Sequence, residues 1–292
     1  MHLPVMKDEV ISFLDPKPCE DFVDCTVGMG GHALAVLERT GPSGRVLGID
    51  VDPTILERLK CKVDGTDYGE RLVLVCDNFA NLGRIVEKYA FKYVSGVLFD
   101  LGLSSWHLEE SGRGFSFLRN EPLDMRYSPK NSLTAETIVN FWSFKDIWRI
   151  LRVYGQERFS RKIAEEIVRS RPLKTTVDLV MAVERATPSW YHRGRIHFAT
   201  RTFQALRIAV NNELENLEKA LPQALDVLGE GGRLVVISFH SLEDRIVKNF
   251  LREKAKKGVV KILTKKPVRP SKEEVAENPR ARSARLRAAL KL

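Results

Sequence analysis

The sequence predicts an α/β fold built on a parallel sheet, with a helical segment inserted after the fourth strand. Three observations predict this fold. A glycine-rich turn at residues 28–31 follows a predicted strand at residues 22–26, which opens on the apolar pair Phe22 and Val23, and precedes a helical pattern. Apolar runs then alternate with helical patterns as far as residue 100. Beyond that point the strand-like runs stop until residue 233, and helical periodicity takes over.

The glycine turn is the element around which the rest is arranged. Glycine lacks a Cβ and tolerates positive φ, so such a turn lets backbone N–H groups approach a ligand closely. The second strand, residues 45–50, ends at Asp50, the spacing of a βαβ unit that presents a carboxylate to a ribose. A plain glycine turn is the alternative, and residues 28–33 also fit the dinucleotide fingerprint G-x-G-x-x-A. The turn therefore predicts a nucleoside cofactor without deciding which one.

The remaining elements follow from the same patterns. Further strands are predicted at residues 72–76, 95–100, 233–239, 259–263 and 284–289. A long helix is expected over residues 200–228, with a kink or break at Pro222. We therefore expect a discontinuous cofactor-binding domain, residues 1–108 with 199–292. A helical substrate-recognition domain, residues 109–198, is expected to be inserted into it.

Composition places the chain among globular proteins. Its 292 residues are enough to bury a core, and 43% are hydrophobic and 29% charged. It contains no apolar run of about 18 residues, so no transmembrane span is expected. The first residues lack the apolar region of a signal peptide. The four cysteines have no C-x-x-C spacing, so we expect reduced cysteines in the cytoplasm and no zinc site.

Charge is distributed unevenly along the chain, whose net charge is +9. Residues 251–292 hold 14 Lys and Arg against 4 Asp and Glu, and residues 109–198 hold 16 against 11. The rest of the chain, with 17 against 23, is acidic. This pattern favours a polyanionic partner contacted outside the nucleotide fold. A solvated basic tail is the alternative.

Motifs spread from end to end carry a resemblance to a known family. They are His2 to Met6, Asp24 to His32, Asp100 to Ser105, Arg113 to Phe117, Pro122 to Arg126, Thr200 to Arg207, Ser238 to Arg245 and Asn278 to Ala284. The chain resembles the bacterial ribosomal RNA small-subunit methyltransferase H family. The resemblance implies a Rossmann-like class I methyltransferase sheet, S-adenosylmethionine as methyl donor, S-adenosylhomocysteine as product, and no metal. It also implies transfer to N4 of a cytidine in 16S ribosomal RNA, in the decoding region of an assembled small subunit.

The chemistry of an exocyclic amine sets what the catalytic residues must do. The N4 lone pair is delocalised into the cytosine ring, whereas the sulfonium methyl group is already activated. The protein must therefore align nitrogen, methyl and sulfur, and accept a hydrogen bond from the amine as the nitrogen becomes positive. Asp100, and Ser104 in the loop that follows it, are candidates for this position.

Two of the catalytic candidates have competing interpretations. The resemblance places the aspartate at the position of Asp100 among the cofactor contacts, and a structural cap is a third alternative for it. His240, after the fifth strand, is the candidate general base. A single histidine is more often structural, and water can take the proton after methyl transfer.

The expected cofactor contacts lie in several loops. Gly28, Gly30, Gly31 and His32 line the turn, Asp50 takes the ribose hydroxyls, and Asp100 holds the methionine amino group. Phe79 is placed to pack on adenine, with an ordinary core aromatic as the alternative. His107 matches a cofactor position of the family that is usually Gln, and this departure changes the shape and the hydrogen-bond donors there.

The RNA target must be single-stranded or flipped, because a paired base cannot present N4 in line with the sulfonium. The expected RNA contacts are Arg113, Phe115, Phe117, Arg126, Arg193, Arg195, Arg280 and Arg282, with Arg285 and Arg287 also meeting phosphates. A loop that packs on the insertion or closes over the cofactor is the alternative for residues 113–126. The expected partner is small-subunit ribosomal RNA within the particle, and the long helical faces are also compatible with a homodimer.

Two other classes of protein remain open at this point. A nicotinamide-dependent oxidoreductase would be separated by a scan of cofactor binding. A non-catalytic RNA-binding assembly factor would bind cofactor and RNA without turnover.

Overall fold

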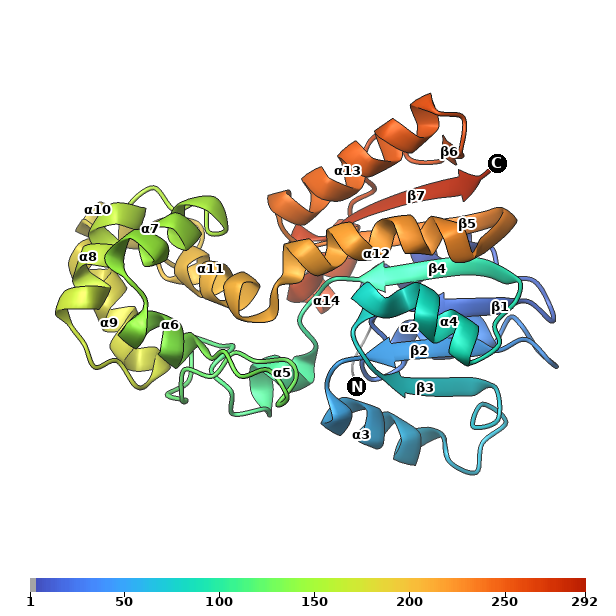
Figure 1. Ribbon diagram of the computed structural model, residues 1–292, viewed down its shortest axis with the longest axis horizontal. Helices are drawn as coiled ribbons and strands as arrows, with labels where there is room; N and C mark the ends of the chain where they lie inside the picture. The colour runs from blue at the N-terminus through green and yellow to red at the C-terminus, as the bar shows by residue number, and fades with distance from the viewer. Residues whose placement is uncertain (1–3) are drawn as a thin grey trace. The chain divides into compact units, whose positions relative to one another are not determined.

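The computed structural model describes residues 4–292 and divides into two compact units (Figure 1). The first unit combines the chain up to Gly102 with Leu214–Leu292, and the second is Leu103–Glu213. The second unit contains the expected insertion, residues 109–198, and extends beyond it at both ends. Leu108 and Phe203, on the helices at those ends, pack into its core. His2 and Leu3, part of the first motif, lie outside the described residues.

The first unit is built on a seven-stranded sheet of order β3-β2-β1-β4-β5-β7-β6. The strands are β1 (Asp21–Asp24), β2 (Val46–Asp50), β3 (Leu72–Cys76), β4 (Val94–Asp100), β5 (Leu228–Ser238), β6 (Val260–Ile262) and β7 (Arg285–Lys291). The first five strands pair in parallel, as the sequence predicts. The final two strands are present, and β7 pairs antiparallel with both β5 and β6. The sequence pattern left their orientation open.

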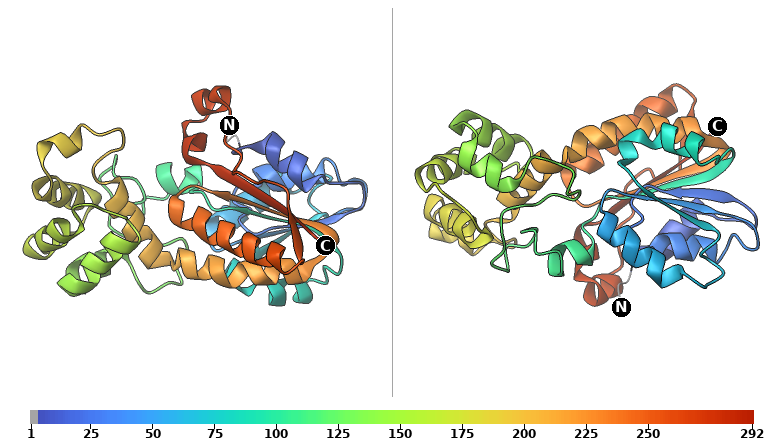
Figure 2. Two further views of the ribbon diagram at one scale, coloured as in Figure 1. Left: turned by 90° about the horizontal axis from the view of Figure 1, so that it is seen from above. Right: turned by 60° about the horizontal axis from the view of Figure 1, so that its bottom comes forward.

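Helices cover both faces of this sheet (Figure 2). One face carries α1 (Lys7–Leu14), α2 (Gly31–Leu37) and α3 (Pro53–Val63), and the other carries α4 (Leu82–Lys88), α12 (Glu213–Val227) and α13 (Ser241–Lys256). Alternate strand residues supply the two cores: Val23 faces α4 and α12, whereas Phe22 faces α1 and α2. Because both faces are buried, the strands appear in the sequence as continuous apolar runs.

The predicted helix over residues 200–228 is two helices, α11 (Thr200–Asn211) and α12. The break lies at Asn212, which adopts a left-handed φ of 50°, and not at Pro222. Asparagine tolerates this conformation better than most residues, so a break there costs little. Pro222 stands inside α12, where the neighbouring Gln223 donates its side-chain amide to the carbonyls of Ala80 and Lys219.

The second unit is helical throughout its described elements. They are α5 (Ser105–Glu109), α6 (Ala135–Phe141), α7 (Phe144–Val153), α8 (Ser160–Arg169), α9 (Thr176–Ala186), α10 (Ser189–His192) and α11. Hydroxyl side chains cap four of them: Ser104 caps α5, Thr134 caps α6, Ser143 caps α7 and Thr175 caps α9. The unit has its own apolar core, as expected of a domain.

Short helical segments complete the first unit. They are η1 (Phe79–Asn81), α14 (Lys272–Glu277) and η2 (Pro279–Ser283). Glu274 of α14 accepts a 2.6 Å hydrogen bond from the backbone N–H of Met6, so residues far apart in the sequence meet there. Over residues 4–292 we find no helix with the length and apolar character needed to cross a membrane.

Candidate active site

The glycine turn lies between β1 and α2 in the first unit. Gly28 and Gly30 have φ values of +49° and +80°, which favour glycine. A Cβ on Gly30 would stand 2.6 Å from the Leu59 side chain of α3, whereas one on Gly28 would have its nearest neighbour 3.8 Å away. Gly30 is thus required by packing as well as by φ. The surface over Gly28 is open to a ligand.

Asp50 ties the end of β2 to this turn. Its Oδ2 accepts the Gly28 N–H at 3.1 Å, and its Oδ1 accepts the Asp52 N–H at 3.0 Å. The carboxylate therefore lies against the turn, at the position where the sequence places a ribose contact. Each oxygen has a second lone pair with which to accept a hydroxyl proton.

Asp100 ends β4, and its backbone N–H donates to Thr26 Oγ1 at 2.7 Å. Its Oδ2 lies 3.5 Å from Nε2 of His32, a histidine that is only 5% exposed. The Oδ1 atom of Asp100 and both ring nitrogens of His32 are buried and make no hydrogen bond within residues 4–292. An unsatisfied buried carboxylate oxygen beside an open turn suits a cofactor that carries a positively charged amino group.

A third carboxyl group, which the sequence analysis did not single out, lies in the same place. Asp24, at the end of β1, is buried, and its Oδ1 accepts the Thr26 N–H. Burial raises the pKa of Asp24 to about 6, and the negative charges of Asp100 and Asp50 act in the same direction, while His32 opposes them. A signal was present in the sequence, because Asp24 follows the apolar pair Phe22 and Val23 and stands four residues before Gly28.

The three aspartates create a negative potential at the carboxyl ends of β1, β2 and β4. These are also the ends at which ligands bind in open parallel sheets, and the strand order reverses between β1 and β4. A cofactor with a sulfonium and an ammonium group matches this potential. The residues of the first unit therefore fit S-adenosylmethionine.

Phe79 is half-buried at the start of η1, just beyond β3. Its ring meets Phe99 edge to face at 5.6 Å and packs against the core. The core contact is therefore present, and the predicted contact with adenine stays a prediction.

Ser104 and His107 belong to the second unit. Ser104 caps α5, and its Oγ lies 2.8 Å from Nδ1 of His107 and accepts the His107 N–H. The buried His107 ring lies edge-on to Phe115 and Tyr127, each at 5.0 Å. This packing fixes the ring, and its cofactor contact stays a prediction.

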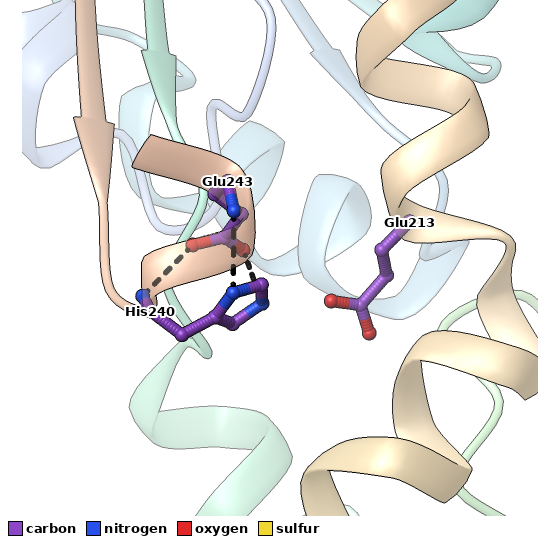
Figure 3. Close-up of side chains that lie close together, drawn as sticks. All are labelled: Glu213, His240 and Glu243. Carbon is purple, nitrogen blue, oxygen red and sulfur yellow. Dashed lines mark hydrogen bonds and ion pairs between the residues drawn. The ribbon is translucent and has the colours of Figure 1, made fainter. Parts of the chain in front are cut away.

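His240 is the N-cap of α13 and forms a capping box with Glu243 (Figure 3). Its Nδ1 accepts the Glu243 N–H at 3.3 Å, and Oε2 of Glu243 accepts the N–H groups of Phe239 and His240. The His240 Nε2 lies 3.0 Å from Glu243 Oε1. With Nδ1 accepting from the backbone and Nε2 facing a carboxylate, the ring has the geometry of a structural cap.

The segment 113–127 is held mainly by its own side chains. Arg126 forms a two-point ion pair with Asp124 and donates to the Asn131 carbonyl, and Arg113 donates to the carbonyls of Arg126 and Tyr127. Phe115 is buried and stacks on Tyr127 at 5.2 Å. These contacts favour the packing alternative for the segment, and its RNA contacts stay predictions.

The other predicted RNA residues differ in accessibility. Arg193, Arg195 and Arg282 are exposed, and Arg280 is half-buried. Phe117 stacks on the exposed His197 at 4.4 Å, so one face of its ring is already covered.

Arg287 is buried and paired within the fold, which argues against its predicted phosphate contact, whereas the predicted contact of the half-buried Arg285 stays a prediction. Both lie on β7 and pair with Asp244 of α13, at 3.4 Å and 2.7 Å, and Arg287 is only 7% exposed. Burial works to raise the Asp244 pKa, but the hydrogen bond and charge of Arg287, with the charge of Arg285, hold it below its usual value. These cations fasten β7 to α13.

The order of this sheet reverses beside a glycine turn, and an acidic cluster lies at its carboxyl edge. These features are typical of Rossmann-like proteins that bind a nucleoside cofactor. The chain belongs to the MraW methylase family, whose family model matches residues 1–292.

Curated relatives agree with this membership over nearly the full length. A protein of Dehalococcoides mccartyi is 48% identical over 307 aligned residues, covering 99% of this chain and 86% of its own. A Thermotoga neapolitana protein is 50% identical, covering 99% and 95%, and a Heliobacterium mobile protein is 46% identical, covering 100% and 99%. All three are named ribosomal RNA small subunit methyltransferase H.

Proposed function

We propose that this protein transfers a methyl group from S-adenosylmethionine to the exocyclic N4 of a cytidine in small-subunit ribosomal RNA. The relatives carry a name for small-subunit RNA methylation, and they align over almost the whole chain. The acidic cluster of Asp24, Asp50 and Asp100 is the observation that carries the cofactor assignment, because it provides the negative potential that a cationic cofactor needs. We place the reaction in the cytoplasm, on 16S RNA in the decoding region of an assembled subunit.

The described residues suggest a division of roles. Asp50 would hold the ribose hydroxyls while it supports the turn at Gly28. Asp100 would bind the amino group through its unsatisfied Oδ1, and the hydrogen bond from its backbone N–H to Thr26 fixes the end of β4 that carries this carboxylate. The cofactor supplies an already activated methyl group, so the protein has mainly to align the acceptor and exclude water.

A proton must leave N4 once the nitrogen has bonded to the methyl group. The carboxylate of Asp100 is one acceptor for the hydrogen bond from the amine. The capping geometry of His240 makes it a weaker candidate for the base, since its Nδ1 already accepts a backbone N–H. Water can take the proton after transfer.

Methyl transfer is tested with labelled S-adenosylmethionine and small subunits from cells that lack the enzyme, beside naked RNA from the same particles. Nucleoside mass spectrometry then locates the label. We expect N4-methylcytidine in the particle, and its absence from naked RNA would show that recognition needs the assembled structure. Label in neither sample, with cofactor binding intact, would contradict the proposal and favour the assembly-factor alternative.

Asp100→Asn is the matched variant for the site. It keeps the shape of the side chain and removes the charge, so we expect a loss of cofactor affinity without loss of fold. Glu57→Gln, the same change at an exposed position of α3, is the control. Equal cofactor affinity in the two variants would remove Asp100 from the site.

A further inference from the structure

We propose that a basic and aromatic pocket between α7 and α8 binds a single-stranded segment of the RNA substrate. The inference rests on the proposed function in that it takes RNA as the substrate. The pocket has a volume of about 430 Å³ and lies wholly within the second unit. The side chains that carry the argument are Trp148, Arg152, Arg158, Phe159, Arg161 and Lys162, and we call this set the α7–α8 pocket.

The cations of the α7–α8 pocket are available to an anion. Arg152, Arg158 and Lys162 are exposed, and within residues 4–292 they form no ion pair with a carboxylate. Arg161 pairs with Glu165 one turn along α8, at 3.1 Å on the surface. Such exposed pairs are worth little, so a phosphate can compete for Arg161 as well.

Glu157, the acidic residue that lines the pocket, already accepts hydrogen bonds from other parts of the unit. Glu157 is 3% exposed, and its Oε1 accepts the Phe159 N–H at 2.8 Å. Its Oε2 accepts the Tyr191 hydroxyl at 2.8 Å. Burial and this bond to Glu157 raise the Tyr191 pKa to about 12, so the phenol remains a donor at neutral pH. The Glu157 carboxylate is thus held in place in the lining of the pocket, where four cationic side chains outnumber it.

The helix dipole does not explain where these cations stand, although Arg161 gains an i,i+4 pair with Glu165. Arg161 and Lys162 occupy the first turn of α8, which has no acidic residue there and no side-chain cap. The positive end of the helix dipole disfavours cations at that position by a few tenths of a kcal/mol each. Positive charge gathered against this preference is consistent with a bound polyanion.

Aromatic rings beside the cations provide surfaces on which bases can stack. Arg152 lies 5.8 Å from the centre of the Trp148 ring, and Phe144 stacks behind Trp148 at 6.2 Å. Arg158 lies over both Phe159 and Trp190, at 5.7 Å and 5.4 Å.

Trp190 is 56% exposed, yet Phe159 and Tyr191 hold its ring from the side. A fixed, exposed aromatic surface flanked by guanidinium groups is the arrangement that binds single-stranded nucleic acid. A duplex would offer its phosphates but not its base faces. The rings therefore point to a single strand.

The test compares the charge-reversal variant Arg152→Glu/Arg158→Glu with the control Lys130→Glu, an exposed cation of the same unit outside the pocket. Binding of a short single-stranded RNA is followed by quenching of tryptophan fluorescence at several salt concentrations. We expect the double variant to bind about 10–100-fold more weakly. Its plot of log affinity against log salt should be shallower by about 1.4, because each phosphate contact to a single strand contributes about 0.7.

A second variant separates stacking from charge. Trp190→Ala should weaken RNA binding by about 5–100-fold while leaving the salt slope unchanged, since base stacking is not ionic. Both variants should keep the wild-type melting temperature and cofactor affinity. On small subunits, KM should rise while kcat stays within about twofold.

The outcomes distinguish this inference from the proposed function. Equal RNA affinity and equal slopes in the double variant and in Lys130→Glu would overturn the inference even if the wild type methylates subunits. Competition by a polyglutamate peptide as strong as that by RNA would replace RNA with an acidic protein and also overturn it. Loss of RNA binding in the variants, with a wild type that never methylates any subunit, would leave the pocket assigned and the proposed function rejected.

Discussion

The buried carboxyl group of Asp24 lowers the stability of the folded protein when it is ionised. Its pKa is raised from 3.8 to about 6, mainly by burial. In the unfolded chain the group ionises at lower pH, so above pH 6 its burial costs the folded state about 3 kcal/mol, and below pH 3.8 the cost vanishes. The same ionised carboxylate adds to the negative potential of Asp50 and Asp100, to which we assign the binding of the cationic cofactor.

We therefore expect Asp24→Asn to stabilise the protein in a pH-dependent way. The gain in the free energy of unfolding should grow from about 1 kcal/mol at pH 4.5 to about 3 kcal/mol at pH 8, because only ionised Asp24 pays for burial. Urea unfolding at the two pH values measures it. A variant that is destabilised equally at both would contradict the assigned cause.

Asp50 has both a structural and a proposed binding contact. Asp50→Ala should weaken S-adenosylmethionine binding by about 10–100-fold, since a hydrogen bond to a charged group contributes about 1.5–3 kcal/mol. Calorimetric titration measures this loss. Asp64→Ala, at the exposed C-terminal end of α3, is the control, and a loss as small as in that control would remove Asp50 from the site.

For single residues, the sequence predicted where a side chain lies in the fold better than what that side chain contacts or does. Asp50 and Asp100 could be placed because the carboxyl ends of parallel strands meet at one edge of the sheet. The ion-pair partner of Arg287 could not be predicted in this way, since Asp244 lies 43 residues away on another element. The role of His240 was readable in part, because Glu243 stands at the third position after it, as in a capping box.

Among the elements, the glycine turn depends on two separate requirements. Gly30→Ala should be strongly destabilising, because its Cβ would stand 2.6 Å from Leu59 and its φ is +80°. Gly65→Ala is the matched control, with φ +74° and no atom within 4 Å of the added Cβ. The control should lose only about 1–2 kcal/mol, the cost of the left-handed backbone. Thermal melts that shift equally would show that contact with Leu59 is unimportant.

The capping box of α13 separates two roles of His240. His240→Ala removes the cap and should cost about 1 kcal/mol of stability, whereas His240→Asn retains a good N-cap residue and should cost little. If the ring is only structural, His240→Asn keeps its methyl-transfer rate and pH profile. A rate that falls equally in both variants, with stability retained in His240→Asn, would restore the general-base role.

The sequence predicted the elements with different success for physical reasons. Strands that are buried on both faces give continuous apolar runs, and most were found within two residues of their true bounds. The exception is β5, which begins at Leu228, five residues before the predicted start, because the glycines at 229–232 hide the extended backbone. The break between α11 and α12 was missed, since Asn212 is compatible with both helical and left-handed backbone. The α7–α8 pocket was also missed, because its side chains come from two helices and the loop between them, and no local pattern reveals how these pack.

For the whole molecule, the uneven charge predicts how RNA binding responds to salt. The net charge of +9 and the exposed cations of the α7–α8 pocket should bring several phosphates into contact. Raising salt from about 50 mM to about 200 mM should then weaken RNA binding on the order of 100-fold through counterion release. Cofactor binding should change far less in the same titration, and affinities for RNA that stay constant would contradict an electrostatic interface.

The place of β7 in the sheet has a consequence for the order in which the chain can fold. A nascent chain emerges with β5 and β6 already made, but neither pairs with the other, because β7 lies between them. Until β7 is in place, β5 presents an open edge, and Asp244 lacks its two arginine partners. The sheet therefore closes only once residues 285–291 have left the ribosome, and a chain stalled before that point would expose an unpaired strand edge that needs a chaperone.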